Sequence, residues 1–239
     1  IAVLGAKGQY LPFDPMLVET GSTLGGVVAS GLSGPGRFRF GGVRDFILGV
    51  RFVDGLGRLL RLGGKVVKNA AGFDVPKFLV GSLGRFGLIG EVTFKVFPRP
   101  ASTLTLKVAA NAETITHAAN SRWELDALDV LPGGEFIVMR LAGPGKALEA
   151  LAREIFSKFP GEIISDSIWD DLREFRWAPA NGPLVKTAIT PGQIGHFINA
   201  HVSGGGNVAY SSSLPATGLT LRGEAPLWIG DRPRFAVED

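Results

Sequence analysis

Small residues are concentrated near the front of the chain, from Thr20 to Gly36, and they are the best candidates for binding chemistry. Where glycine removes the Cβ, main-chain N–H groups can approach an anion closely, and serine adds a donor with little bulk. Neither a helix interior nor a strand interior favours so many glycines, so we interpret the segment as backbone that must approach a ligand closely, with N–H groups directed at phosphate or ring oxygens. The candidate binding residues are Thr23, Gly25, Gly26, Ser30, Gly31, Ser33 and Gly34.

A flexible surface loop is the alternative interpretation of this segment. The apolar triplet Val27-Val28-Ala29 follows the paired glycines directly. A mobile linker seldom contains such a triplet, because its composition is polar or glycine-rich throughout. We therefore favour a folded binding segment over a linker.

A second glycine-rich segment runs from Gly81 to Glu91 and leads into an apolar run. Its glycines precede the expected strand, whereas the Rossmann fingerprint follows a strand and opens a helix. No lysine followed by Ser or Thr completes a Walker A motif. The usual nicotinamide and nucleoside triphosphate motifs are therefore excluded. The candidate binding residues of this segment are Gly84, Gly87, Leu88 and Ile89.

The composition is that of a globular protein and excludes several kinds of site. No cysteine occurs, which rules out disulfides, cysteine nucleophiles and iron–sulfur ligation by this chain. Residues 1–100 hold 13 Lys and Arg against 6 Asp and Glu, so this part favours an anionic ligand. The basic residues are dispersed with little aromatic interleaving, which argues against nucleic acid. No apolar run is long enough to predict a membrane span.

The expected elements form two lobes, 1–100 and 101–239, divided at Phe97-Pro98-Arg99-Pro100. In the first lobe we expect a hairpin with strands at 46–54 and 58–62, a helix at 74–81 capped by Asp74, and a strand at 88–97. In the second lobe we expect strands at 103–109, 135–141, 183–189 and 208–212, with helices at 112–123, 144–159 and 191–200. This alternation predicts an α+β protein whose second lobe is a ferredoxin-like α/β layer.

Four stretches together resemble the flavin-binding domain shared by vanillyl-alcohol oxidase, D-lactate dehydrogenase and glycolate oxidase. They are Thr23-Leu24-Gly25-Gly26, Gly42-Val43-Arg44-Asp45, the run from Lys68 to Asp74, and the turn from Gly81 to Gly87. Their order and spacing match the family over about the first hundred residues. The string Leu11-Pro12-Phe13-Asp14-Pro15, with Gly31-Leu32-Ser33-Gly34-Pro35, resembles glycolate oxidase E subunits in particular.

The resemblance implies FAD as the cofactor. Residues 1–100 would be the second subdomain, or C-terminal portion, of a PCMH-type FAD-binding domain, and 101–239 an FAD-linked oxidase C-terminal lobe. The family's first flavin lobe is expected before Ile1. The residues matched to the flavin diphosphate and ring are Thr23, Gly25 and Gly26. Those matched to the ribityl chain and ring edge are Ser30, Gly31, Ser33 and Gly34. Those matched to the adenine end are Gly84, Gly87, Leu88 and Ile89.

Departures from the family pattern bear on activity. Leu83 stands where catalytic relatives usually carry a carboxylate or an amide, and its side chain forms no hydrogen bond. The segment from His201 to Ala209 matches the His-x-Gly-Asp-Gly-Asn-x-His motif of catalytic D subunits only loosely, without its aspartate or second histidine. We interpret the other candidates as solvated helix or strand residues; they are His117, His196 and Lys186. A non-catalytic flavin subunit is therefore expected.

The resemblance as a whole implies an FAD-binding subunit of a glycolate oxidase complex. Its partners would be the catalytic flavoprotein D subunit and an iron–sulfur F subunit, and a small 2-hydroxy acid would be the substrate of the complex. We expect a cytoplasmic location, extended by peripheral contact with the inner membrane through the complex. Two alternatives stay open: a stand-alone flavin oxidoreductase for another 2-hydroxy acid, and a flavin-free scaffold paralogue.

Overall fold

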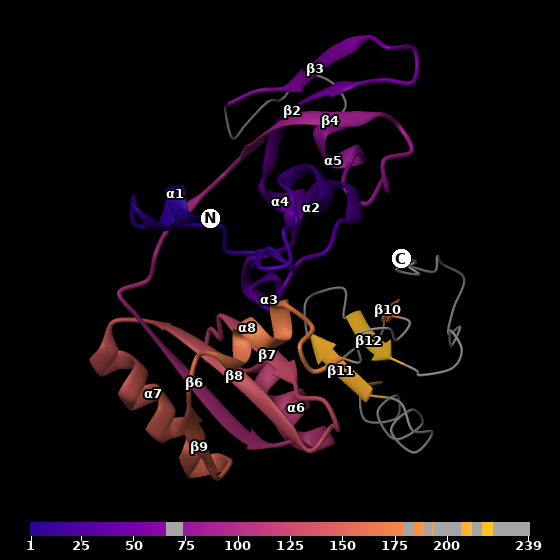
Figure 1. Ribbon diagram of the computed structural model, residues 1–239. Helices are drawn as coiled ribbons and strands as arrows, with labels where there is room; N and C mark the ends of the chain where they lie inside the picture. Colours follow the sequence, from indigo (N-terminus) through magenta and orange to yellow (C-terminus); the bar gives the residue numbers. More distant parts are fainter. Residues whose placement is uncertain (66–73, 179–183, 189–192, 194–206, 212–216, 222–239) are drawn as a thin grey trace. The chain divides into compact units, whose positions relative to one another are not determined.

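The chain divides into two compact units, Ile1–Arg99 and Pro100–Asp239 (Figure 1). The structure is a computed structural model that describes residues 1–65, 74–178, 184–188, 193, 207–211 and 217–221. Each unit combines helices with an antiparallel sheet, which confirms the α+β prediction. Each also has its own buried apolar cluster.

The first unit is built on a three-stranded antiparallel sheet in the order β3-β2-β4. Its strands are β2 (Ile47–Val53), β3 (Leu59–Gly63) and β4 (Leu88–Phe94). The predicted hairpin is confirmed, and its turn is held by Asp54, whose carboxylate accepts from the N–H groups of Leu56 and Arg58 at 2.9 and 3.0 Å. The strand predicted at 88–97 ends at Phe94, because β5 (Phe97–Pro98) pairs instead with β1 (Gln9–Tyr10).

The first unit contains several short helices. The described ones are α1 (Ala2–Gly5), α2 (Leu24–Ser30), α3 (Arg37–Phe40), α4 (Val43–Phe46) and α5 (Val75–Phe78). Of these, α2 and α5 contact the strands of this sheet. The core has Phe13 at its centre, whose ring centroid lies 5.4 Å from that of Phe46 and 5.7 Å from that of Phe94. The helix predicted at 74–81 is shorter than expected. Asp74 stands at its N-cap but makes no capping bond and pairs with Lys77 Nζ at 2.8 Å.

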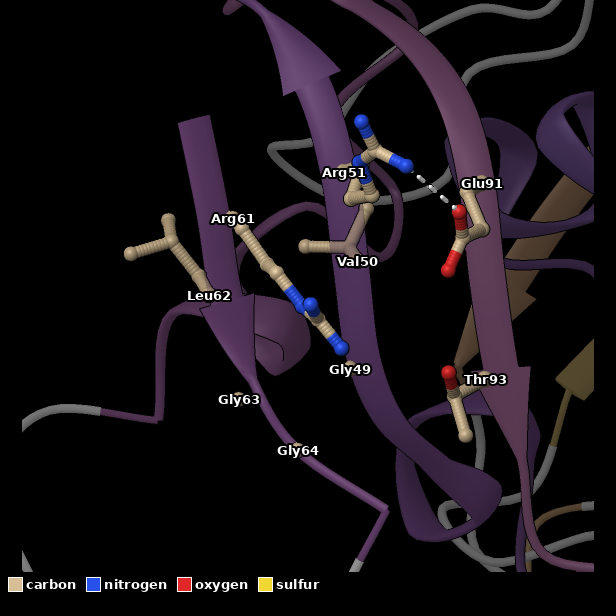
Figure 2. A pocket seen from close by; sticks show the side chains of 9 residues that line it. All are labelled: Gly49, Val50, Arg51, Arg61, Leu62, Gly63, Gly64, Glu91 and Thr93. Carbon is tan, nitrogen blue, oxygen red and sulfur yellow. Dashed lines mark hydrogen bonds and ion pairs between the residues drawn. The ribbon is translucent and has the colours of Figure 1, made fainter. Parts of the chain in front are cut away.

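The outer face of the same sheet carries a shallow hollow (Figure 2). Residues paired across antiparallel strands point to the same side of a sheet, and side chains alternate between the two sides. The register therefore places two successive rows on the outer face, Arg61–Arg51–Glu91 and Gly63–Gly49–Thr93. The intervening residues Val50 and Phe52 point inward and are buried.

The second unit contains a βαββαβ arrangement, which confirms the predicted ferredoxin-like layer. In chain order its elements are β6 (Ser102–Ala109), α6 (Ala112–Asn120), β7 (Ala127–Val130), β8 (Phe136–Gly143), α7 (Gly145–Lys158) and β9 (Gly161–Ile164). These strands lie in the order β7-β8-β6-β9, all antiparallel. Three further strands extend the sheet beyond β7 in the order β11-β12-β10. They are β11 (Asn207–Ser211), β12 (Thr217–Leu221) and β10 (Leu184–Ala188).

Both faces of the ferredoxin-like sheet are covered. On one face, Val138 and Ala127 pack against Trp169 and Leu172 of α8 (Ile168–Arg173), a helix that we did not predict. Strand alternation turns Ile137, Met139 and Leu141 to the other face, where they are fully buried. The strand and helix predictions from 103 to 159 are confirmed to within a few residues, except that α6 ends at Asn120. The helix predicted at 191–200 lies outside the described residues.

Candidate functional site

Part of the first glycine-rich segment folds as the helix α2, Leu24–Ser30. α2 begins after Thr23, whose hydroxyl oxygen accepts from the Gly26 N–H at 3.0 Å. A threonine N-cap contributes about 1 kcal/mol, and burial of Val27 and Val28 outweighs the cost of about 1 kcal/mol for each helical glycine. The prediction that these glycines do not lie in a helix was therefore wrong, because capping and burial exceed the low helix propensity of glycine.

The C-terminal end of α2 is joined to the second glycine-rich segment through the main chain. The Gly81 N–H donates to the Val28 carbonyl, and the Leu83 N–H donates to the Ala29 carbonyl, both at 2.9 Å. Gly31 ends the helix with φ at 64°, and a Cβ there would lie 3.1 Å from the Gly81 nitrogen. Position 31 therefore requires glycine both for its left-handed backbone and for the close turn beside it. Two segments far apart in the sequence thus form one continuous structure.

The N-terminal end of α2 lies beside the start of β4. A Cβ at Gly25 would lie 3.5 Å from the Ile89 carbonyl oxygen, which is an ordinary van der Waals distance. Helix geometry leaves the N–H groups of Leu24 and Gly25 without acceptors inside α2. The residues that flank Gly25 and Ile89 in the sequence are exposed. The structure thereby brings together Thr23, Gly25, Gly26, Leu88 and Ile89.

The two predicted serines form bonds within their own loop. Ser30 Oγ accepts from the Leu32 N–H at 3.3 Å. Ser33 Oγ accepts from the Val43 N–H at 3.1 Å, which fixes the loop to the first residue of α4. These hydroxyl groups position the backbone next to α2.

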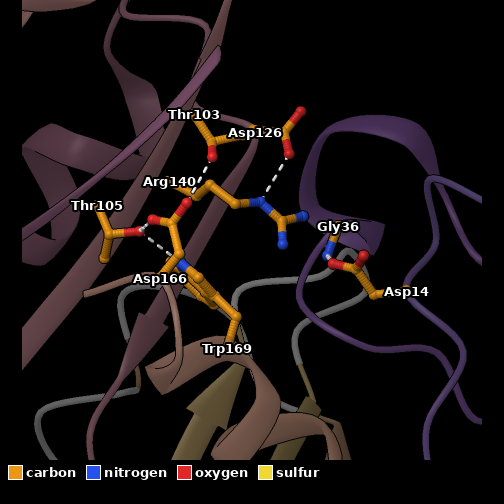
Figure 3. Close-up of polar contacts among 8 residues, drawn as sticks. All are labelled: Asp14, Gly36, Thr103, Thr105, Asp126, Arg140, Asp166 and Trp169. Atoms are coloured by element: carbon orange, nitrogen blue, oxygen red, sulfur yellow. Dashed lines mark hydrogen bonds and ion pairs between the residues drawn. The ribbon is translucent and has the colours of Figure 1, made fainter. Parts of the chain in front are cut away.

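Gly34 is likewise tied to the core of the unit. Its N–H donates to the carbonyl oxygens of Phe13 and Asp14, both at 2.9 Å. The buried Asp14 carboxylate accepts from the Gly36 N–H at 2.8 Å (Figure 3). Asp14 is a positioning residue that we did not predict. Its signal in the sequence was a carboxylate inside the otherwise apolar run from Leu11 to Met16.

The Gly81–Glu91 segment forms a tight turn against β2. A Cβ at Gly87 would overlap the Val53 carbonyl oxygen, and φ at this residue is 146°, so no other residue fits. Gly84 lies exposed in the turn. Leu83 adopts a left-handed conformation with φ at 53°, which is uncommon for a branched side chain. The turn is therefore held in shape by its contacts with α2 and β2.

Exposed apolar side chains border this joint between α2 and the turn. The ring centroids of Phe78 and Phe86 are 4.5 Å apart, and 58% and 46% of these side chains are exposed. Leu24, Leu83 and Leu88 are exposed by 51%, 39% and 72%. Such a set of uncovered apolar side chains is suited to contact with a planar ring system or another apolar surface.

The loop between α3 and α4 is stabilised by Asp45 and by its charged neighbour Arg37. Asp45 Oδ2 accepts from the Gly42 N–H at 2.8 Å. Burial lowers the pKa of Arg37 below its ordinary value, and the nearby Asp45 carboxylate opposes that shift. Arg37 nevertheless stays protonated at neutral pH, because an arginine in a protein does not lose its proton there. Arg37 and Asp45 therefore form an oppositely charged pair with no net charge next to the loop that contains Ser33.

The second unit contains a buried polar network that we did not predict (Figure 3). Arg140 Nε donates to Asp126 Oδ2 at 2.7 Å, and its guanidinium lies 5.2 Å from the Trp169 ring centroid. Trp169 Nε1 donates to Thr105 Oγ1 at 2.7 Å, and that hydroxyl donates to Asp166 at 2.5 Å. The signal was an arginine within the apolar strand from Phe136 to Leu141. Because its groups are paired with one another, the network ties α8 to the sheet.

His117 of α6 is exposed, as predicted, and its ring lies beside two aromatic rings. The His117 ring centroid is 5.0 Å from that of Trp123 and 5.3 Å from that of Phe159. Lys186 lies in β10, opposite Leu219 of β12. The remaining candidates, His196 and His201, lie outside the described residues. Within the described part of the chain, no group of three or more His, Asp or Glu side chains is arranged to hold a metal ion.

Comparison with known proteins identifies the class of the first unit. Residues 2–63 match the family model described as "FAD binding domain". The match includes the first glycine-rich segment and ends before the second. The predicted cofactor, FAD, is confirmed by this match. The first unit thus contains a region similar to an FAD binding domain.

The chain is a relative of glycolate oxidase subunit GlcE of Escherichia coli K12, with 39% identity over 177 residues. The aligned region covers 72% of this chain and 49% of that protein. Glycolate oxidase subunit GlcD of Bacillus subtilis is 33% identical over 132 residues, which cover 55% of this chain and 27% of that protein. The chain therefore spans about half the length of the first relative and about a quarter of the second.

A solved structure of alkyldihydroxyacetonephosphate synthase has the same fold. The two align with a TM-score of 0.66 over 92% of this chain and 54% of the other, at 17% identity. None of the helices that the structure describes has the length and apolar character needed to cross a membrane.

Proposed function

We propose that this chain is the FAD-binding subunit of a glycolate-oxidising complex. In that complex it would bind flavin beside a catalytic D-type subunit and relay electrons toward an iron–sulfur F subunit. Two findings support the proposal: the match to an FAD binding domain and the relation to GlcE over most of this chain. A small 2-hydroxy acid would be the substrate of the complex.

We assign residues 1–100 to the C-terminal portion of a PCMH-type FAD-binding domain, and residues 101–239 to an FAD-linked oxidase C-terminal lobe. The ferredoxin-like order of β7-β8-β6-β9 supports the second assignment. Arg140, Asp126 and Trp169 would stiffen this lobe without taking part in the reaction, since their polar groups pair with one another.

The observation that carries the proposal is the contact between the two glycine-rich segments. Gly25 lies against Ile89 at one end of α2, and Gly31 lies against Gly81 at the other. Residues matched to the flavin diphosphate and to its adenine end therefore share one exposed strip, with Leu24 and Leu88 uncovered beside it. Bound FAD supplies the capacity to accept two electrons and pass them on singly. The chain would bind it mainly with backbone N–H groups and apolar contacts.

The test is to add a methyl group to this strip without disturbing the fold. In the Gly25→Ala variant the new Cβ meets only ordinary contacts with Ile89, so the fold tolerates it. Alanine also raises helix propensity, so stability should stay level or rise by about 0.5–1 kcal/mol. Overpacking against a bound cofactor costs about 1–3 kcal/mol, which is a loss of FAD affinity of about fivefold to 160-fold. The measurement is the quenching of flavin fluorescence when FAD is titrated into the purified chain.

Gly145→Ala is the matched control, because Gly145 also lies in the first turn of a helix and has only one neighbour, at 3.9 Å. It should bind FAD like the unaltered chain. Equal affinity in the Gly25→Ala variant would remove α2 from the flavin site. A chain that binds no FAD, but still associates with the catalytic subunit, would favour the flavin-free scaffold.

A further inference from the structure

The hollow on the outer face of the three-stranded sheet is lined by an arginine, Arg61, that forms no ion pair with the described residues. Arg61 points from β3 across β2, and its guanidinium ends above Gly49 (Figure 2). It makes no ion pair or hydrogen bond with any residue that the structure describes. Its neighbour in the same row differs, because Arg51 Nη1 pairs with Glu91 Oε2 at 3.1 Å.

A hydroxyl group stands on the opposite side of this hollow. Thr93 lies on β4, directly across Gly49 in the register, and it is half-buried. Its hydroxyl forms no hydrogen bond within the described residues. Gly49 lies between Arg61 and Thr93 without a side chain, and the main chain of Gly64 lies close to it on the β3 side of the hollow.

The glycines themselves are explained by the packing of β2 against the chain that follows β3. A Cβ at Gly49 would lie 2.8 Å from the Gly64 carbonyl oxygen. The glycines are therefore no evidence for a ligand, and the proposal rests on the guanidinium and the hydroxyl that line the hollow. The three charged groups of the hollow, Arg51, Arg61 and Glu91, sum to one positive charge.

We propose that this hollow binds a small monocarboxylate, with Arg61 and Thr93 as its ligands. A guanidinium presents two parallel N–H groups that match the two oxygens of a carboxylate, and the threonine hydroxyl can donate to one of them. A single net positive charge suits a monoanion, and the Glu91 carboxylate disfavours a dianion such as phosphate. This site is made of sheet residues only, so it is independent of the proposed flavin function.

The test is a titration of the ¹⁵N-labelled chain with sodium acetate and sodium glycolate, followed by NMR. Sodium phosphate and sodium chloride at matched ionic strength serve as comparison ligands. Because Arg61 is exposed, we expect weak binding, with a dissociation constant on the order of 10 mM. The amide signals of residues 49, 63, 64 and 93 should shift and saturate with the carboxylates.

Two variants should change the affinity for the carboxylate in opposite directions. Arg61→Gln should weaken carboxylate binding at least about tenfold, because it removes the charged fork. Glu91→Gln should strengthen binding several-fold, since it removes a negative charge and frees Arg51. Arg153→Gln, which alters an exposed arginine of α7, should change nothing.

Unchanged binding by Arg61→Gln would overturn the proposal. Shifts that chloride reproduces would do the same and would indicate an adventitious ion only. FAD binding is measured on the same samples. Loss of carboxylate binding with retained flavin affinity is the expected result for Arg61→Gln.

Discussion

Replacing Gly31 with alanine tests the contact that unites the two glycine-rich segments. Gly31 ends α2 in a left-handed conformation, and a Cβ there would lie 3.1 Å from the Gly81 nitrogen and 3.2 Å from its Cα. The obstructing atoms belong to the main chain, so they cannot rotate away as the end of a side chain can. We expect Gly31→Ala to destabilise the first unit and to displace the Gly81 turn.

The loss of unfolding free energy in Gly31→Ala has two parts, and a second variant, Gly57→Ala, measures one of them alone. A left-handed backbone costs a residue with a Cβ about 1–2 kcal/mol. Gly57, in the β2–β3 turn, has φ at 77°, and no atom lies within 4 Å of the place that a Cβ would take, so Gly57→Ala should show this part alone. Crowding against the turn adds about 1–3 kcal/mol at position 31. Gly31→Ala should therefore cost about 2–5 kcal/mol in total.

The assay has to report on the first unit alone. All four tryptophans follow residue 100, so their fluorescence follows the second unit. Hydrogen exchange by mass spectrometry in increasing urea, read on peptides covering 24–34 and 79–91, measures the opening free energy of the first unit. Tryptophan fluorescence in the same samples provides the internal control and should be unchanged.

Equal costs for the Gly31→Ala and Gly57→Ala variants would refute this reasoning. In that case only backbone conformation would matter at position 31, and the close approach to Gly81 would carry no energy. A large loss in the tryptophan signal would also contradict it, because the second unit contains neither glycine.

The remaining predictions concern charged groups. Asp126→Ala should destabilise the second unit by about 3 kcal/mol or more, because it leaves the Arg140 charge buried without its 2.7 Å partner; the urea midpoint of tryptophan fluorescence measures this. The pKa of Asp54 is lowered from 3.8, chiefly by the hydrogen bond from the Arg58 side chain. A lowered pKa stabilises the folded hairpin above pH 3.8, and this stabilisation is lost as pH falls through the lowered value. Amide exchange in the turn should rise over that range, and in Asp54→Asn it should show no such dependence.

The second lobe was predictable because its signals are local and periodic. The apolar spacing of Leu148, Leu151 and Ile155 fixes α7, and alternation along 103–109 fixes β6. β9 was not predicted, since its Gly161–Ile164 span is only four residues and mostly exposed at the sheet edge. α8 was missed for a similar reason: six residues give too few turns for a visible periodicity.

The first glycine-rich segment shows why composition alone misled us. Glycine content indicated a loop, yet the threonine before the glycines and the two valines after them determine a helix. Both features are present in the sequence, but predicting the helix requires comparing their stabilising free energies with the cost of the glycines. The candidate flavin-binding residues were nevertheless predicted in two groups, one from each glycine-rich segment. The structure places the two segments in contact, at Gly25 with Ile89 and at Gly31 with Gly81.

The buried polar residues could not be predicted with the same method. The Asp14 carboxylate accepts from the N–H of Gly36, and Arg140 pairs with Asp126, the residue before β7. Their roles depend on which segments meet in space, and no periodic pattern encodes that. Arg61 and Thr93 illustrate the same limit, because only the strand register places them on either side of Gly49.

The joint between α2 and the following turn uses only peptide groups, from Gly81 and Leu83 to the carbonyls of Val28 and Ala29. The side chains at positions 85 and 86 take no part in these bonds, so substitutions there can change the chemistry of the exposed surface while the hydrogen-bonded main chain keeps its shape. Position 83 differs, because its left-handed backbone restricts which residues fit, although its N–H bond to Ala29 does not depend on the side chain.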